Sequence, residues 1–234
     1  AYAGAGTSAR LAVQDGTELT PTYGWPRERL VFLVAGGSEA LSHAIEGAED
    51  DAGAGAAAAD AEALGSADVL VGVSASGRTP YTVGAVERAR RSGALTVGIA
   101  NNAGTPLIAA AEHPVLIDTG AESIAGSTRM KAGTAQKAAL TLFSTLVMIR
   151  LGRVYDGLMV DMVANNAKLR ARALAMLSEI AGADGASAQA ALDAAGGHVK
   201  LAVLISRGLG PEAAQALLDE HGGDLRHALA ALGK

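Results

Sequence analysis

Four carboxylates crowd into the segment AIEGAEDD, where Glu46, Glu49, Asp50 and Asp51 fall within a single short stretch. Two carboxylates can act as general acid and general base when their surroundings separate their pKa values. Charge clusters of this kind usually lie in water, so the spacing alone favours a solvated acidic face by roughly four to one. Residue types alone therefore do not single out a working carboxylate here.

Three glycine-rich segments that also carry serine or threonine follow predicted strands. They are GAGTSAR (Gly4–Arg10), SASGRTP (Ser74–Pro80) and GAESIAGSTRMKAGTAQK (Gly120–Lys137). Glycine lets backbone N–H groups approach an anion, and the following helix adds partial positive charge. For one such loop a helix N-cap is the commoner role, at roughly two in three, but three loops at one sheet edge favour an anion site. Neither a Walker GxxxxGK[ST] pattern nor a complete dinucleotide fingerprint is present, so a sugar phosphate is expected rather than a nucleotide.

The composition argues against several other kinds of chemistry. The chain of 234 residues has no cysteine, and its histidines form no HxxxH or HExxH pair, so neither thiolate catalysis nor a zinc site is expected. A net charge of −5 argues against a nucleic-acid partner. No apolar run reaches membrane-spanning length and no signal peptide is visible, so we expect a cytoplasmic protein without a membrane partner. Because AYAGAGTS enters partway through a strand, we expect that an N-terminal piece is missing.

Short apolar runs alternate with helical patterns over the first half of the chain. Buried strands are predicted at Leu30–Gly37, Asp68–Ser76, Ala94–Asn101 and His113–Asp118, with the end of another in AYAG. Helices are predicted at Ser8–Gly16, Glu39–Asp50, Tyr81–Ser92 and Thr105–Ala111. This alternation predicts an α/β fold, a doubly wound parallel sheet flanked by helices. Ligands bind such sheets at the carboxyl ends of the strands, where the glycine-rich segments lie.

The second half of the chain is predicted to be helical. Long helices are expected at Thr128–Leu151 and Val160–Ile180, and Asp51–Asp60 is expected to be a loose connection. Gln189–Leu204 and Gln215–Ala230 form a weak repeat, each with a helix, a Gly-Gly stop and a second helix. A helical cap is favoured over a partner-binding module by roughly three to one. We therefore expect a sugar-phosphate domain over 1–165 and a small all-helical subdomain over 166–234.

The same segments resemble a known family. SASGRTP resembles the phosphate loop of sugar isomerase (SIS) domains, and GAESIAGSTRMKAGTAQK is similar to a signature of N-acetylmuramic acid 6-phosphate etherases and glucokinase regulatory proteins. The resemblance extends through GAGTSAR, LTPTYG, AIEGAEDD, GRVYDGLMVDMVANNAKLRARA and the C-terminal helices, and so covers nearly the whole chain. It implies a SIS-type fold and the cleavage of N-acetylmuramic acid 6-phosphate to N-acetylglucosamine 6-phosphate and D-lactate. The reaction is an elimination followed by hydration, needs no cofactor and serves peptidoglycan recycling.

The resemblance also implies roles for particular residues. The family's catalytic glutamates fall on Glu18, which would protonate the departing lactate oxygen, and on Glu49, the candidate to take the C2 proton. The residues implied for substrate binding are Ser74, Ser76 and Thr79 for the 6-phosphate, with Thr7 and Ser8 near the sugar or phosphate. Arg129, at the start of the predicted long helix, would pair with the phosphate or the lactyl carboxylate. An ion pair with Glu122 is an equally expected role for this arginine.

The resemblance also bears on how the chain assembles and on which other functions are possible. Ala9 stands where the family usually has glycine, and its methyl would crowd the sugar if the backbone lies close. The helical segment that precedes the first loop in the family is expected to be absent from this chain. SIS-type sites are often built near subunit interfaces, so a homodimer is expected. The main alternative is a non-catalytic sugar-phosphate-sensing regulatory protein. A ketose–aldose isomerase would share the phosphate loop but has no reason to carry the signature around Arg129.

Overall fold

The computed structural model describes residues 1–233, which form two compact units. The first comprises residues 1–18 and 26–144, and the second comprises 19–25 and the chain from Thr145 onward. The predicted boundary between residues 165 and 166 lies inside the second unit. As a division into domains, it stays a prediction.

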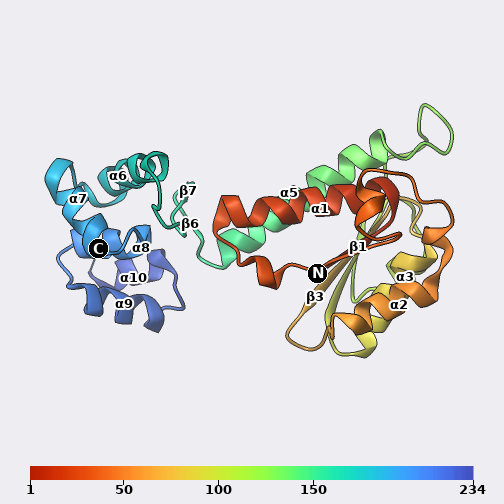
Figure 1. Ribbon diagram of the computed structural model, residues 1–234, viewed down its shortest axis with the longest axis horizontal. Helices are drawn as coiled ribbons and strands as arrows, with labels where there is room; N and C mark the ends of the chain where they lie inside the picture. The colour runs from red at the N-terminus through yellow and green to blue at the C-terminus, as the bar shows by residue number, and fades with distance from the viewer. Residues whose placement is uncertain (234) are drawn as a thin grey trace. The chain divides into compact units, whose positions relative to one another are not determined.

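The first unit is built on a parallel sheet. Within residues 1–233 this sheet has five strands in the order β2-β1-β3-β4-β5 (Figure 1). The strands are β1 (Tyr2–Gly4), β2 (Phe32–Val34), β3 (Val69–Ser74), β4 (Leu95–Ala100) and β5 (His113–Leu116). They confirm the predicted α/β class. The prediction that β5 is buried is wrong, because this strand lies at the edge of the sheet and all of its residues are exposed.

Helices cover both faces of the sheet (Figure 1). One face carries α1 (Gly6–Tyr23) and α5 (Lys131–Arg150), and the other carries α2 (Ala52–Ala61), α3 (Pro80–Arg91) and α4 (Pro106–Ala110). Side chains of a strand alternate between faces. In β3, Leu70 packs in one apolar cluster with Ala85 of α3, whereas Val71 and Val73 pack in another with Leu140 of α5. The doubly wound arrangement therefore follows from the period of two in the strands.

The prediction of a loose connection at Asp51–Asp60 is wrong, because α2 occupies Ala52–Ala61. The small residues of this segment serve helix packing. A Cβ on Gly55 would lie 2.0 Å from the carbonyl oxygen of Tyr81, and one on Gly84 of α3 would lie 2.2 Å from a carbonyl oxygen of α2. The backbones of α2 and α3 can approach this closely only where side chains are missing.

The helix predicted at Glu39–Asp50 is also wrong. Two short 3₁₀ turns, η2 (Ser38–Leu41) and η3 (Ala48–Asp50), lie near its ends, and a loop joins them. Gly47 has φ 74°, in the left-handed region that interrupts a right-handed helix. The loop therefore also carries His43, which was predicted to lie on that helix.

The second unit is largely helical. Its helices are α6 (Ala167–Ala181), α7 (Gly185–Ala194), α8 (Val199–Ser206), α9 (Pro211–Glu220) and α10 (Leu225–Ala231). The predicted repeat is confirmed: Gly196 and Gly197 have φ values of 57° and 84°, and Gly222 and Gly223 have 61° and 78°. Both glycine pairs end a helix with the same left-handed turn, which glycine adopts without steric cost.

The helix predicted at Val160–Ile180 begins only at Ala167. The Asn166 side chain caps it by accepting a 2.9 Å hydrogen bond from the N–H of Leu169. Before it, β6 (Val154–Tyr155) and β7 (Leu158–Met159) form a hairpin that was not predicted. Its turn is Asp156-Gly157, with φ values of 46° and 80°, a pair favoured in tight hairpins.

Candidate functional site

The loops after β1, β2 and β3 meet at the carboxyl edge of the sheet. β1 lies between β2 and β3, and Gly4 at its end is in register with Val34 and with Val73. Adjacent strands are about 4.8 Å apart. The GAGTSAR segment after β1 and the SASGRTP segment after β3 therefore lie next to each other, at the edge where ligands bind such sheets.

The loop between β3 and α3 gathers three hydroxyl groups. Ser74 Oγ lies 2.8 Å from Thr79 Oγ1 and 3.3 Å from Ser76 Oγ, and it accepts a 3.1 Å hydrogen bond from the N–H of Gly77. Gly77 has φ +65°, and a Cβ there would lie 2.2 Å from Thr105 Oγ1, so the turn requires glycine. The three residues predicted to hold a phosphate thus lie together at the N-terminus of α3, where partial positive charge favours an anion.

Ser8 belongs to a buried chain of polar side chains. Its Oγ donates a 2.9 Å hydrogen bond to Oε1 of Gln136 in α5, and Nε2 of Gln136 donates a 2.9 Å bond to Oδ1 of Asn101. Asn101 Nδ2 in turn donates to the carbonyl of Ile117 at 2.9 Å. The hydroxyl proton of Ser8 is therefore engaged inside the protein. Gln136 lies within the segment GAESIAGSTRMKAGTAQK but was assigned no role there, and Asn101 belongs to no motif, so the sequence did not single out either side chain.

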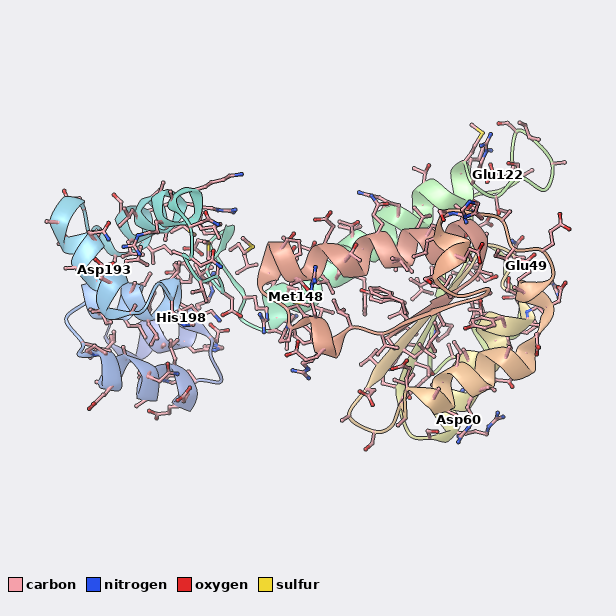
Figure 2. All side chains as sticks on the ribbon, viewed as in Figure 1. Glu49, Asp60, Glu122, Met148, Asp193 and His198 are labelled. Atoms are coloured by element: carbon pink, nitrogen blue, oxygen red, sulfur yellow. The ribbon has the colours of Figure 1, made fainter. Side chains whose placement is uncertain are left out.

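A cavity of about 250 Å³ lies beyond the ends of β1 and β2, and Glu49 lines it. Figure 2 shows Glu49 on the segment that precedes α2. The other lining residues are Ala5, Gly6, Arg10, Ala35, Ala40, His43, Ala44, Ile45, Glu46 and Gly47. The turn η3, which carries Glu49, also contacts α3, the helix that follows the three hydroxyls. Glu49 therefore lines a cavity and belongs to a turn that contacts α3.

Glu18 lies far along α1 from that cavity and is exposed. It is eight positions beyond Arg10, the last residue of α1 that lines the cavity. At a rise of 1.5 Å per residue, this distance along the helix is about 12 Å. The structure therefore does not bring Glu18 and Glu49 together within one chain.

Arg129 precedes α5, which begins at Lys131, and so does not lie on this helix as predicted. It lines an open cavity of about 760 Å³ together with Thr119 and Lys131, separate from the cavity of Glu49. Glu122, the other predicted partner of Arg129, accepts hydrogen bonds of 3.1 Å and 3.0 Å from the N–H groups of Lys131 and Ala132. This carboxylate thus provides acceptors for two backbone N–H groups that the first turn of α5 would otherwise leave unpaired.

Two further predicted residues, Thr7 and Ala9, stand at the start of α1. Thr7 is partly buried, and its Cγ2 lies 3.5 Å from the place of a Cβ on Gly133 of α5. Ala9 is only 2% exposed and is not among the residues that line the cavity of Glu49. Its methyl group therefore packs inside the protein.

Asp15 is a partly buried carboxylate one turn before Glu18 on α1. Burial raises the pKa of Asp15, and hydrogen bonds from Ser144 Oγ at 3.0 Å and Tyr2 Oη at 3.2 Å oppose this shift. Burial, followed by the Asp15 charge, also raises the pKa of Tyr2. A lone Asp in a helix forms no motif, so the sequence pointed to neither residue of this pair.

Within residues 1–233, no three His, Asp or Glu side chains are grouped as a metal site would require. Over the same residues, no helix has the length and apolar character needed to span a bilayer.

Comparisons with known proteins support the sequence resemblance. The model for the glucokinase regulatory protein N-terminal SIS domain matches residues 1–90, and the SIS domain model matches residues 52–146. The N-acetylmuramic acid 6-phosphate etherase of Deinococcus radiodurans is 55% identical over 229 residues, which are 97% of this chain and 75% of that protein. The etherase of Streptomyces coelicolor is 52% identical, over 98% of this chain and 74% of its own. Among solved structures, the C-terminal domain of glucosamine-fructose-6-phosphate aminotransferase from Francisella tularensis matches 81% of this chain and 48% of its own, with 17% identity and a TM-score of 0.47.

Proposed function

The chain belongs to the N-acetylmuramic acid 6-phosphate etherase family, and we propose that it cleaves the D-lactyl ether of N-acetylmuramic acid 6-phosphate. The products are N-acetylglucosamine 6-phosphate and D-lactate, in the recycling of peptidoglycan amino sugars. At the site, the observation that carries this proposal is the grouping of three hydroxyls in the Ser74–Thr79 loop, at the same carboxyl edge of the sheet as the cavity that Glu49 lines.

The reaction needs two proton-handling groups. In the ring-opened sugar, the C1 aldehyde acidifies the proton on C2, and Glu49 removes it. Glu18 protonates the lactate oxygen as the C3–O bond breaks, which leaves an unsaturated aldehyde. One water then adds to that aldehyde and places its oxygen on C3. Carboxylates can serve both steps when their protonation states differ, and no cofactor takes part.

The remaining site residues bind the substrate. The hydroxyls of Ser74, Ser76 and Thr79 hold the 6-phosphate, with help from the N-terminus of α3. Thr7 and Ser8 lie near the sugar or the phosphate. Because the Ser8 proton is donated to Gln136, its oxygen acts there as an acceptor. Arg129 pairs with an anionic group of the substrate.

A homodimer completes this proposal. Glu18 lies about 12 Å along α1 from Arg10, the last residue of this helix that lines the cavity of Glu49, so a second copy of the chain supplies the glutamate that one chain does not bring there. α5 also exposes apolar side chains that a partner would cover, since Leu142 is 65% exposed and Leu146 is 59% exposed. We place the protein in the cytoplasm, because a charged sugar phosphate does not cross a membrane unaided.

Incubation with N-acetylmuramic acid 6-phosphate in ¹⁸O-water tests the activity. We expect the wild type to release D-lactate and to leave the heavy oxygen at C3 of the sugar. Glu18→Gln and Glu49→Gln should each reduce lactate release at least about 100-fold, as expected when a general acid or base is lost.

Two outcomes would contradict the proposal. Heavy oxygen in the lactate, rather than in the sugar, would exclude elimination across C2 and C3. A folded wild type that binds the sugar phosphate without releasing lactate would instead favour a non-catalytic sensor.

A further inference from the structure

Arg10 lines the same cavity as Glu49. It lies on the second turn of α1, and its Nη1 donates a 2.8 Å hydrogen bond to the carbonyl of Ala40 in η2. Among the residues of 1–233 that line this cavity, it is the only lysine or arginine, and the acidic ones are Glu46 and Glu49. A guanidinium has five N–H donors, and the bond to Ala40 uses one of them.

The substrate of the proposed reaction carries two anions, the 6-phosphate and the lactyl carboxylate at C3. If the hydroxyl loop beyond β3 holds the phosphate, the other end of the sugar lies toward the cavity beyond β1 and β2. A third carboxylate next to Glu49 and Glu46 would suffer like-charge repulsion unless a cation compensates it. The one arginine of the cavity is placed to do so, and the N-terminus of α1 at Gly6 adds partial positive charge.

We propose that Arg10 binds the lactyl carboxylate of the substrate and so selects the lactyl ether over other sugar phosphates. This inference rests on the proposed etherase function. It assigns the lactyl end to the cavity of Glu49, and it leaves the phosphate to Arg129, which lines a different cavity. The planar fork of the guanidinium fits a carboxylate with two parallel hydrogen bonds. The product sugar has no lactyl group and so loses this contact.

The test compares N-acetylmuramic acid 6-phosphate with the same molecule carrying a primary amide in place of the lactyl carboxylate. The readout is the ratio of kcat/KM for the acid to kcat/KM for the amide. We expect the wild type to favour the acid on the order of 10- to 100-fold, the usual worth of a charge-assisted hydrogen bond. Arg10→Gln should bring the ratio close to one, and Arg10→Lys should keep most of the preference. Arg91→Gln, which removes the same charge from the exposed face of α3, should leave the ratio unchanged.

A purely structural role of Arg10, as a tether for the loop through Ala40, predicts a different result. In that case Arg10→Gln would lower the rates on acid and amide equally, and it would also weaken binding of N-acetylglucosamine 6-phosphate, measured by calorimetry. Either of those results overturns the assignment.

Failures of the two proposals are distinguishable. A wild type that processes acid and amide equally overturns the role of Arg10 while the etherase function stands, and this holds even if Arg10→Gln fails to fold. A wild type that releases nothing from either compound counts against the etherase function itself.

Discussion

Ionisation of Asp15 should make the free energy of unfolding depend on pH. Its pKa is raised by burial in the folded chain, so the native carboxyl keeps a proton at pH values where the unfolded chain has lost it. Stability therefore falls as pH rises through the window between the unfolded and folded pKa values. Asn cannot titrate, so the free energy of unfolding of Asp15→Asn should rise relative to wild type as the pH increases above the ordinary Asp pKa of about 4. Urea denaturation at several pH values measures this difference.

Tyr2→Phe is the matched variant for this prediction. The Tyr2 hydroxyl donates to Asp15 and favours its carboxylate form, so removing it should raise the Asp15 pKa further. The pH-dependent loss of stability should then be larger than in wild type. Differences from wild type that stay constant with pH, in both variants, would contradict this account.

Gln136 is the residue on which the buried polar chain depends. Its side chain is fully buried and joins Ser8 to Asn101. Gln136→Leu keeps a similar volume but leaves a hydroxyl and an amide oxygen unpaired, which should lower the free energy of unfolding by about 2–4 kcal/mol. The control is Lys137→Gln at the exposed neighbouring position, where a change within about 0.5 kcal/mol is expected. Equal values for both variants, from denaturant unfolding, would show that this chain adds no stability.

At the scale of elements, the contact between α2 and α3 supports the site. η3, with Glu49, leads into α2 and touches α3, the helix that follows the hydroxyl loop. Gly84→Ala would place a methyl group 2.2 Å from a carbonyl oxygen of α2 and force the helices apart. We expect a loss of about 1–3 kcal/mol in the free energy of unfolding, together with a lower kcat/KM.

Gly53→Ala is the control for that prediction. Gly53 lies on the exposed side of α2, and the nearest group to an added Cβ is a side-chain oxygen of Asp51 at 3.2 Å. Alanine also has a helix propensity better by up to about 1 kcal/mol. Thermal unfolding should thus show Gly53→Ala to be neutral or slightly stabilising. If Gly84→Ala were also neutral or stabilising, the claim that the backbones of α2 and α3 pack too closely for a side chain at this position would be contradicted.

At the scale of the whole molecule, the separation of Glu18 and Glu49 makes a prediction about the assembly. Glu18→Gln and Glu49→Gln chains, each inactive alone, should recover activity when mixed and refolded together. If each site combines glutamates from two copies, random mixing gives hybrids in half of the dimers, each with one intact site. Lactate release should then reach about a quarter of the wild-type rate, as two-fold symmetry requires. Hybrids that are seen by native mass spectrometry but stay inactive would show that both glutamates act from one chain.

Features that depend on local patterns could be predicted from the residues alone. The short apolar runs, with their β-branched residues and their Gly or Pro boundaries, predicted the strands of the sheet, and the Gly-Gly stops predicted the paired helices of the second unit. The hydroxyl residues after β3 were likewise predicted to act together, because Ser74, Ser76 and Thr79 are close in the chain. Such patterns predict local structure because backbone geometry depends on residues that are neighbours in the chain.

How distant segments meet depends on packing in three dimensions, and no local pattern predicted it. The segment now seen as α2 is rich in Gly and Ala, and its helix is stabilised by contact with α3, which no local pattern reports. Arg10 and Glu49 are far apart in sequence, yet they line one cavity because β1 and β2 are neighbours in the sheet. Glu18, by contrast, is carried away from that cavity by the length of α1. Packing joins or separates such residues, since it acts through space rather than along the chain.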